Sequence, residues 1–334
     1  MAYSPAGNLT SSSGLAHYAT VYYKRRGLDR LQKIFRFRDV TMKDILPKQN
    51  GRTVQWFRYN NLNALTTPTT EGTVGTSEAV SSNVLQAVVS QYTAFISASD
   101  LLVDTLIDPL VVNFSELLGY QAGLSVDTMT RNVIDAQAVG MNQNPLGTYL
   151  RVADLRAARH DMQADDVQPM ESGEYAGWFA ALVHPFASFD LVNDPAAGGL
   201  ADIVKYNMPV ASTPLIKYED RGLLTYVGGC RVVESTNVFT SSGPNKYRTY
   251  IFGKNAVGSV DLEGRGPSNV TNPDNQRFKI RTIIPKGDNI ADPEGVIGAA
   301  VSYNFVFAAV VLQGPAGIGG PYRGRVIDTE STLG

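Results

Sequence analysis

Two glycine-containing segments are the first candidates for chemistry, because such loops can bind phosphates. The segment FGKNAVGS (252–259) contains Gly-Lys, but no glycine lies five residues before Gly253, and Asn255 stands where a phosphate loop has Ser or Thr. The segment GPAGIGGP (314–321) follows an expected strand, but its prolines and the absence of a helical pattern after it argue against a dinucleotide-binding turn. Neither segment predicts nucleotide binding.

Acidic, histidine and cysteine side chains are the other candidates. Asp165 and Asp166, with Glu171 and Glu174 nearby, have the chemistry of acid/base or calcium groups, but a solvated helix end and loop explains them more simply. His184 precedes Pro185 at the end of an apolar stretch, which indicates a structural turn. The single Cys230 excludes an intrachain disulfide, and three scattered histidines give no zinc spacing. We therefore expect no active site, no metal and no cofactor.

Charge is strongly segregated along the 334 residues, although the net charge is only −2. Residues 1–58 hold eleven Lys/Arg and three Asp, which gives +8, whereas residues 59–130 hold seven acids and no Lys or Arg, which gives −7. A basic arm therefore precedes an acidic body. The basic residues of interest are Lys24, Arg25, Arg26, Arg30, Lys33, Arg36 and Arg38.

The arm needs a partner surface, because Arg36 and Arg38 alternate with Phe35 and Phe37 and an extended chain would carry charge on one side and rings on the other. A phosphate backbone is one possible partner. The other, which we favour, is the acidic region of a second copy of the chain. The expected acceptor residues are Asp100, Asp104, Asp108, Glu116 and Asp127.

A long hairpin is expected after the arm. Residues 52–59 (RTVQWFRY) and 84–97 (VLQAVVSQYTAFIS) are rich in β-branched and aromatic residues and predict strands. The segment between them has six threonines, two glutamates and few apolar side chains, so it must be disordered or ordered by another surface. Folded double, it reaches about 40 Å, which suits contact with a neighbouring subunit better than a free surface loop. The expected tip residues are Thr66, Thr67, Thr69, Thr70, Glu71 and Thr73.

A long helix is predicted next, capped by Asp108, beginning at Pro109 and running to about residue 135. The residues at helical spacing that we expect to face the core are Leu110, Phe114, Leu117 and Leu124, with Val111, Leu118 and Met129 at the edge of that face.

Shorter elements follow. An amphipathic helix is predicted over 151–166, with Val152, Leu155 and Met162 inward, and strands over 177–185, 223–235, 246–253 and 277–285. The apolar run 296–312 is just too short for a membrane span and contains Ser302 and Asn304, so it predicts a buried strand that pairs with strands near the start. The first twenty residues lack the apolar stretch of a signal peptide. The fold class is α+β.

Four short motifs are the most specific features of the chain: Thr-Glu-Gly in the hairpin, Ile-Asp-Pro before the long helix, His-Pro after a strand and Phe-Gly-Lys-Asn-Ala at 252–256. The blocks that contain them cover about residues 15–312. In content and order these blocks resemble the major capsid proteins of tailed bacteriophages typified by the podophage N-four.

The resemblance implies the phage-capsid fold named after phage HK-ninety-seven. It assigns residues 1–50 to an N-terminal arm, 51–97 to the extended loop, 98–139 and 277–315 to a peripheral domain with a spine helix, and 140–276 to an axial domain. The C-terminal residues 316–334 lie outside the strong resemblance, and their glycines and prolines predict a tail that orders on contact rather than a domain. Lysine-to-asparagine crosslinking through the extended loop is excluded, because residues 59–130 contain no lysine.

The resemblance further implies self-assembly into hexamers and pentamers of an icosahedral head around double-stranded DNA. Expected partners are portal and scaffolding proteins and a cement protein; no scaffolding segment is expected in the chain itself. No membrane partner is expected, and the location would be the virion, with assembly in the host cytoplasm. An encapsulin-like compartment of the same fold is the alternative, and an enzyme is the third class, for which no constellation of residues speaks.

Overall fold

A computed structural model describes residues 36–75, 77–105, 110–143, 145, 147–171, 173–194, 199, 216–219, 222–240, 246–263, 281–283, 297–314 and 320–333. The chain divides into two units, 1–32 and 33–334, and every described residue belongs to the second. Five of the seven basic-arm residues lie outside the described part, as does Asp108.

A five-stranded sheet is organised around the long strand β13 (Ile297–Val311). Strand β4 (Ser90–Ser99) pairs antiparallel with its first part, and β11 (Val257–Leu262) pairs with its last part. The order is β1-β11-β13-β12, where β1 is Met42–Leu46 and β12 is Arg281–Ile283. The apolar run 296–312 is thus a strand that pairs with an early strand, as the sequence predicts.

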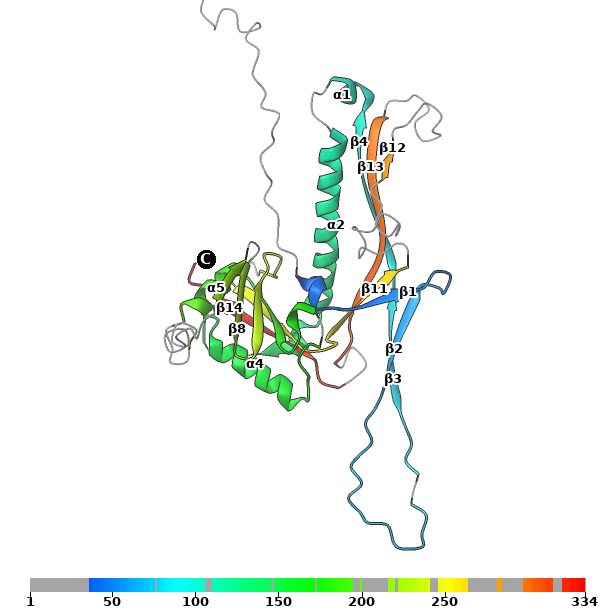
Figure 1. Cartoon of the computed structure of the whole chain (residues 1–334), viewed down its shortest axis with the longest axis vertical. Helices are drawn as coiled ribbons and strands as arrows, with labels where there is room; N and C mark the ends of the chain where they lie inside the picture. The colour runs from blue at the N-terminus through cyan, green and yellow to red at the C-terminus, as the bar shows by residue number, and fades with distance from the viewer. Residues whose placement is uncertain are drawn as a thin grey trace, which may run out of the picture. The chain divides into compact units, whose positions relative to one another are not determined.

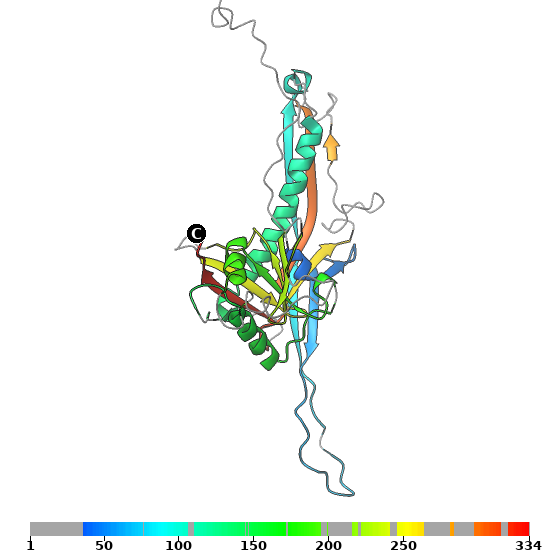
Figure 2. The ribbon, with the colours of Figure 1, turned by 60° about the vertical axis from the view of Figure 1, so that its left-hand side comes forward.

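Helix α2 (Leu110–Asp135) covers one face of this sheet, and Figures 1 and 2 show it alongside β4 and β13. Alternate residues of β13, among them Val301 and Phe305, pack against α2 because successive side chains of a strand point to opposite faces. The helix is rotated from the predicted orientation. Its buried stripe is Leu118, Ala122 and Val126, which packs with Val301 and Phe305 of β13, whereas Leu117 is 41% exposed. A short helix α1 (Asp100–Thr105) precedes it.

A seven-stranded sheet forms the second layer, in the order β5-β14-β10-β6-β9-β8-β7. These strands are β5 (Asn142–Gln143), β6 (Phe179–Val183), β7 (Ile216–Glu219), β8 (Gly222–Val227), β9 (Cys230–Glu234), β10 (Lys246–Phe252) and β14 (Gly324–Glu330). The predicted strand over 223–235 is two strands, because Gly228 and Gly229, both with positive φ, form the turn between them.

Helices α4 (Val152–Ala164) and α5 (Pro185–Val192) pack on one face of the seven-stranded sheet. Val152, Leu155 and Met162 are buried there, which confirms the predicted inward face of α4. The opposite face packs against the end of α2, the helix α3 (Ala138–Met141), and the 3-10 helices η3 (Phe37–Val40) and η4 (Gly173–Tyr175).

The expectation for the C-terminal tail is wrong for residues 324–330. Strand β14 lies inside the seven-stranded sheet, paired antiparallel over seven residues with β10 and parallel with β5. Its adjacent residues Val326 and Ile327 are both buried, Val326 in the core on one face of the sheet and Ile327 in the core on the other, but the preceding Gly/Pro run hides the strand in the sequence. Strands β1 and β11, from ranges expected to form the arm and the axial domain, likewise belong to the five-stranded sheet.

Candidate assembly surfaces

The hairpin of β2 (Thr53–Tyr59) and β3 (Ser82–Val88) has two different faces. Val54 and Trp56 pack against the core of Leu46, Val89 and Val260 and anchor the hairpin to the five-stranded sheet. The opposite face is apolar and exposed: Phe57 and Val84 are cross-strand partners, 66% and 54% exposed, and Tyr59 lies edge-on to Phe57 with ring centroids 5.8 Å apart. The single strand predicted over residues 84–97 is two strands. Strand β3 ends at Val88, and after Val89 the chain continues as β4 of the five-stranded sheet.

The segment that joins β2 to β3 makes almost no contact with the rest of its own chain. Asn60 N donates to Ser81 O at 2.9 Å where the two legs separate, and every described residue from Asn61 to Ser82 is exposed. Figures 1 and 2 show two open legs beyond that point. The six expected tip residues are all exposed, and Glu71 lies in a turn in which Thr73 N donates to Thr70 O at 3.2 Å and Gly72 has φ 84°.

The described end of the basic arm is tied to its own chain. Arg38 Nη2 donates to Asp261 Oδ2 of β11 at 2.7 Å, and Arg36 Nη1 lies 3.8 Å from Asp39 Oδ2. Phe37 is fully buried and meets the Tyr250 ring edge-on at 5.0 Å. These residues therefore act as an anchor for the arm, whereas the sequence predicted only an outward role for Arg36 and Arg38.

The acidic acceptor residues divide into two groups. Asp100, Asp104 and Glu116 are exposed along α1 and the first half of α2. Asp127 is only 1% exposed, so its assignment to an outward acidic surface is wrong. The physical reason is the helical period, which carries Asp127 to the buried side next to Val126.

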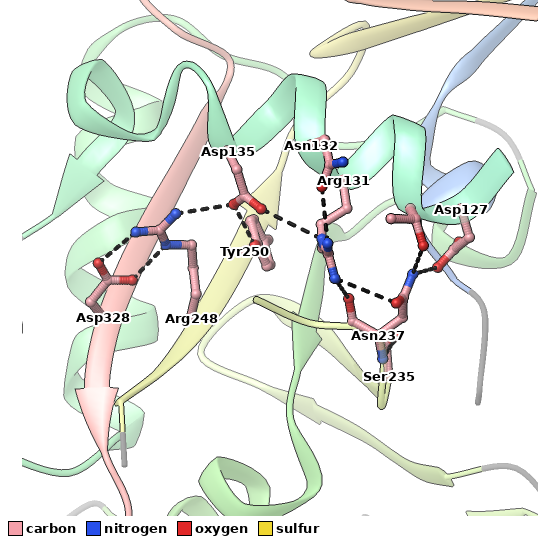
Figure 3. Close-up of polar contacts among 10 residues, drawn as sticks. Asp127, Arg131, Asn132, Asp135, Ser235, Asn237, Arg248, Tyr250 and Asp328 are labelled. Atoms are coloured by element: carbon pink, nitrogen blue, oxygen red, sulfur yellow. Dashed lines mark hydrogen bonds and ion pairs between the residues drawn. The ribbon is translucent and has the colours of Figure 1, made fainter. Parts of the chain in front are cut away.

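Asp127 instead holds the arm's own backbone. Its Oδ1 accepts from Phe37 N at 2.8 Å, and its Oδ2 accepts from Asn237 Nδ2 at 2.8 Å (Figure 3 shows the bond to Asn237). Burial raises the pKa of Asp127 to about 6, although both hydrogen bonds favour the ionised form. The carboxylate thus joins the arm, α2 and the loop after β9 at one buried point.

A second set of polar contacts joins the last turn of α2 to the seven-stranded sheet (Figure 3). Arg248 of β10 forms a bidentate pair with Asp328 of β14, at 2.7 and 2.9 Å, and its Nη1 donates to Asp135 Oδ1 at 3.1 Å. Tyr250 OH donates to the same oxygen at 2.6 Å, and Asp135 raises the pKa of that phenol in addition to the effect of burial. Bidentate pairing of this kind fixes direction as well as distance.

Arg131 continues this network toward Asp127. Its Nη1 donates to Asn237 O at 3.0 Å, and its Nε lies 3.6 Å from Asp135 Oδ2. Sequence reasoning missed the network, because its members come from four parts of the chain and its directly bonded residues lie up to 115 positions apart in the sequence. Only the alternation of Arg248 and Tyr250 on one strand signals a shared face.

The acidic, histidine and cysteine residues that the sequence offered as catalytic or metal-binding candidates do not form one site. Asp165 pairs with Arg325, Glu171 pairs with Lys254, and His184 Nδ1 accepts from Phe186 N at the start of α5. Burial raises the pKa of Cys230 to about 12. No cluster of three metal-ligating side chains occurs among the described residues, and no helix in that part of the chain is long and apolar enough to cross a membrane.

Comparisons with solved structures cover nearly the whole chain. The capsid of cyanophage P-SCSP1u aligns with 98% of this chain and 100% of its own, with a TM-score of 0.65 and 13% identity. The capsid of Ralstonia phage GP4 aligns over 94% and 96%, with a TM-score of 0.65 and 13% identity. An encapsulin complex from Synechococcus elongatus PCC 7942, holo-SrpI, aligns over 97% and 96%, with a TM-score of 0.52 and 11% identity. No protein-family model and no curated protein sequence matches the chain.

These likenesses show the fold. The chain has the α+β architecture of tailed-phage major capsid proteins, the HK-ninety-seven-like fold, which confirms the fold class expected from the sequence.

Proposed function

We propose that this protein is a major capsid protein, which self-assembles into hexamers and pentamers of an icosahedral head that encloses double-stranded DNA. The observation that carries the proposal is the hairpin loop. Every described residue from Asn61 to Ser82 is exposed, next to an exposed apolar face that includes Phe57 and Val84. A chain with the fold of capsid proteins supplies such a surface in each neighbouring copy.

The loop needs a second copy for an energetic reason. Fixing the backbone of one residue costs about 1 to 2 kcal/mol of free energy at room temperature, because conformational entropy is lost. The loop has few apolar side chains whose packing on one another could offset this cost. Contact with an adjacent subunit supplies the missing apolar area and hydrogen bonds. The threonine-rich legs favour extended, strand-like contact.

The basic arm gives the second part of the proposal. Asp100, Asp104 and Glu116 are its remaining acidic acceptors in the described chain, and the arm residues before Arg36 would bind them on another copy. Such exposed pairs are weakened by salt, because the Debye length falls from about 10 Å at 0.1 M to about 3 Å at 1 M.

Negative-stain microscopy and sedimentation of the purified protein at low and high salt test the proposal. Closed shells or rings of five and six copies at low salt, loosened at high salt, are the expected result. A 36.1 kDa monomer under all conditions, including in the presence of the phage's other head proteins, would refute self-assembly. Shells indifferent to salt would refute only the role of the arm.

An encapsulin-like compartment is the second candidate, and the likeness to the Synechococcus complex favours it over other non-viral functions. Shells purified from the native source separate the two candidates by their contents. Nuclease-protected double-stranded DNA supports the phage head, whereas enclosed enzyme without DNA supports the compartment.

Portal and scaffolding proteins are the partners that a phage head of this kind would need, and a cement protein would add noncovalent strength. The proposed location is the virion, with assembly in the host cytoplasm. The chain itself would act as a structural protein and not as an enzyme.

A further inference from the structure

The root of the N-terminal arm, residues 37–41, is attached to α2 and to both sheets. Phe37 N donates to Asp127 Oδ1 of α2 at 2.8 Å, and Thr41 Oγ1 lies 2.8 Å from Ser259 Oγ of β11 in the five-stranded sheet. The Phe37 ring is fully buried in the core that covers one face of the seven-stranded sheet. The contacts of this arm root therefore determine where the arm leaves the body of the chain.

Asp127 holds the arm root from α2, and its own side chain is held in place by Asn237. The carboxylate is buried, and while Oδ1 binds the arm root, Oδ2 accepts from Asn237 Nδ2 at 2.8 Å (Figure 3). Asn237, only 1% exposed, is fixed in turn, because its backbone O accepts from Arg131 Nη1 at 3.0 Å and its N donates to Ser235 Oγ at 3.3 Å. Both carboxylate oxygens are thus used, one for the arm and one to orient the side chain.

The bond between Asp127 and Phe37 N stabilises the arm root more than a surface contact would. Hydrogen bonds to an ionised carboxylate are about twice as strong as those between neutral groups. A buried backbone N–H that loses its acceptor has no water to replace it. Removal of the Asp127 carboxylate therefore favours a state in which the arm root detaches, Phe37 N is hydrated and the Phe37 ring leaves the core.

We propose that Asp127 is a latch that fixes the origin of the basic arm on α2. With the carboxylate in place the arm begins at Phe37, whereas without it residues 37–41 detach and the arm begins at β1. The inference rests on the proposed function, because it concerns how the arm reaches a neighbouring copy. A fixed origin lowers the entropy that the arm loses on binding, whereas a detached root must be ordered again, so the latch favours assembly.

Trypsin cleavage after Arg38 tests the latch in the unassembled chain, because a protease cuts this bond only when the arm root detaches from the body. Asp127→Leu keeps the size of the side chain but removes both acceptors, and it is expected to raise the rate of this cut about tenfold or more. Mass spectrometry identifies the product that begins at Asp39. Asp127→Asn keeps one acceptor for Phe37 N, so it is expected to raise the rate less. A wild-type rate in Asp127→Leu overturns the proposal.

Met162→Ala is the control for a general loss of stability. Met162 is fully buried between α4 and the other face of the seven-stranded sheet, so its truncation destabilises the fold without touching the arm root. It is expected to lower the free energy of unfolding in urea but to leave the cut after Arg38 close to the wild-type rate. Equal acceleration by Met162→Ala and Asp127→Leu would show that trypsin reaches Arg38 only through global unfolding, and the latch would be refuted.

A second test asks whether the latch acts through the arm. Asp127→Leu is expected to raise the protein concentration at which half of the chains sediment as shells by about tenfold. The same substitution is then made in a chain with a neutral arm, which carries Lys24→Gln, Arg25→Gln, Arg26→Gln, Arg30→Gln and Lys33→Gln. There it is expected to add nothing, and a further rise would place its effect in the body and overturn the proposal. If wild type forms no shells, the proposed function fails, whereas the cleavage test still decides the latch.

Discussion

The hairpin loop and the seven-stranded sheet are opposites in how they are stabilised. The sheet has buried strands such as Phe179–Val183, two flanking layers and the Arg248 network that joins β10, β14 and α2. The loop has a turn at Thr70–Thr73, one pair of bonds at Asn60 and Ser81, and exposed side chains throughout its described residues. The difference teaches that one region is stable within a single chain, whereas the other gains its order from a partner.

Excision of the loop tests this contrast with the largest expected effect. Replacing residues 61–80 by Asn-Gly closes β2 and β3 with a two-residue turn. Shells should disappear completely, while the free energy of unfolding of the unassembled chain should not fall, since no packing is lost and a shorter loop costs less entropy to close. Sedimentation and urea unfolding measure the two. A shortened chain that still forms wild-type shells would remove the loop from assembly.

Substitution of Arg248 should show the reverse pattern. Arg248→Met removes the cation that pairs with Asp328 and leaves the mostly buried Asp135 with only the more distant Arg131, which should lower the free energy of unfolding by about 2 to 3 kcal/mol. Arg156→Met is the control, because Arg156 is exposed on α4 and the same change in chemistry removes no ion pair with another described residue. Equal stability of the two variants in urea would show that the network adds nothing to the sheet.

Asp127 gives a smaller, pH-dependent effect. Its pKa is raised from 3.8 to about 6 on folding, so the folded state binds the proton more tightly, and the stability present at low pH is lost as pH rises from about 4 to about 6. Asp127→Asn abolishes this term, so its stability relative to wild type should be up to about 3 kcal/mol greater at pH 7 than at pH 4. Urea unfolding at both pH values measures the difference.

The neutral variant Gln121→Ala, exposed on the same helix, is the control for Asp127→Asn. Its stability should follow the wild-type pH profile. If Asp127→Asn follows that profile as well, the Asp127 carboxylate does not titrate between pH 4 and pH 7 in the folded protein.

The sequence predicted the elements with a clear period or composition, including β2, α2, α4 and β13, because local patterns determine them. It failed where long-range geometry decides. The face of α2 that is buried depends on the sheet beneath it, which is why Leu117 and Asp127 were misplaced. Strand β14 follows a Gly/Pro run that gives no hint of its partners β5 and β10. The exposed tip was predictable, since a threonine-rich segment with few apolar residues cannot pack on itself.

The place of β14 between β5 and β10 has a consequence for synthesis. The ribosome finishes the loop near residue 83 long before it reaches Glu330, and at about 5 to 20 residues per second this interval is roughly 12 to 50 s. During that time the β2–β3 hairpin can form, while the seven-stranded sheet still lacks β14, which pairs with seven residues of β10. A chain truncated before β14 would therefore carry the hairpin without a complete seven-stranded sheet. Only after β14 has been synthesised can a nascent copy complete its fold and assemble correctly.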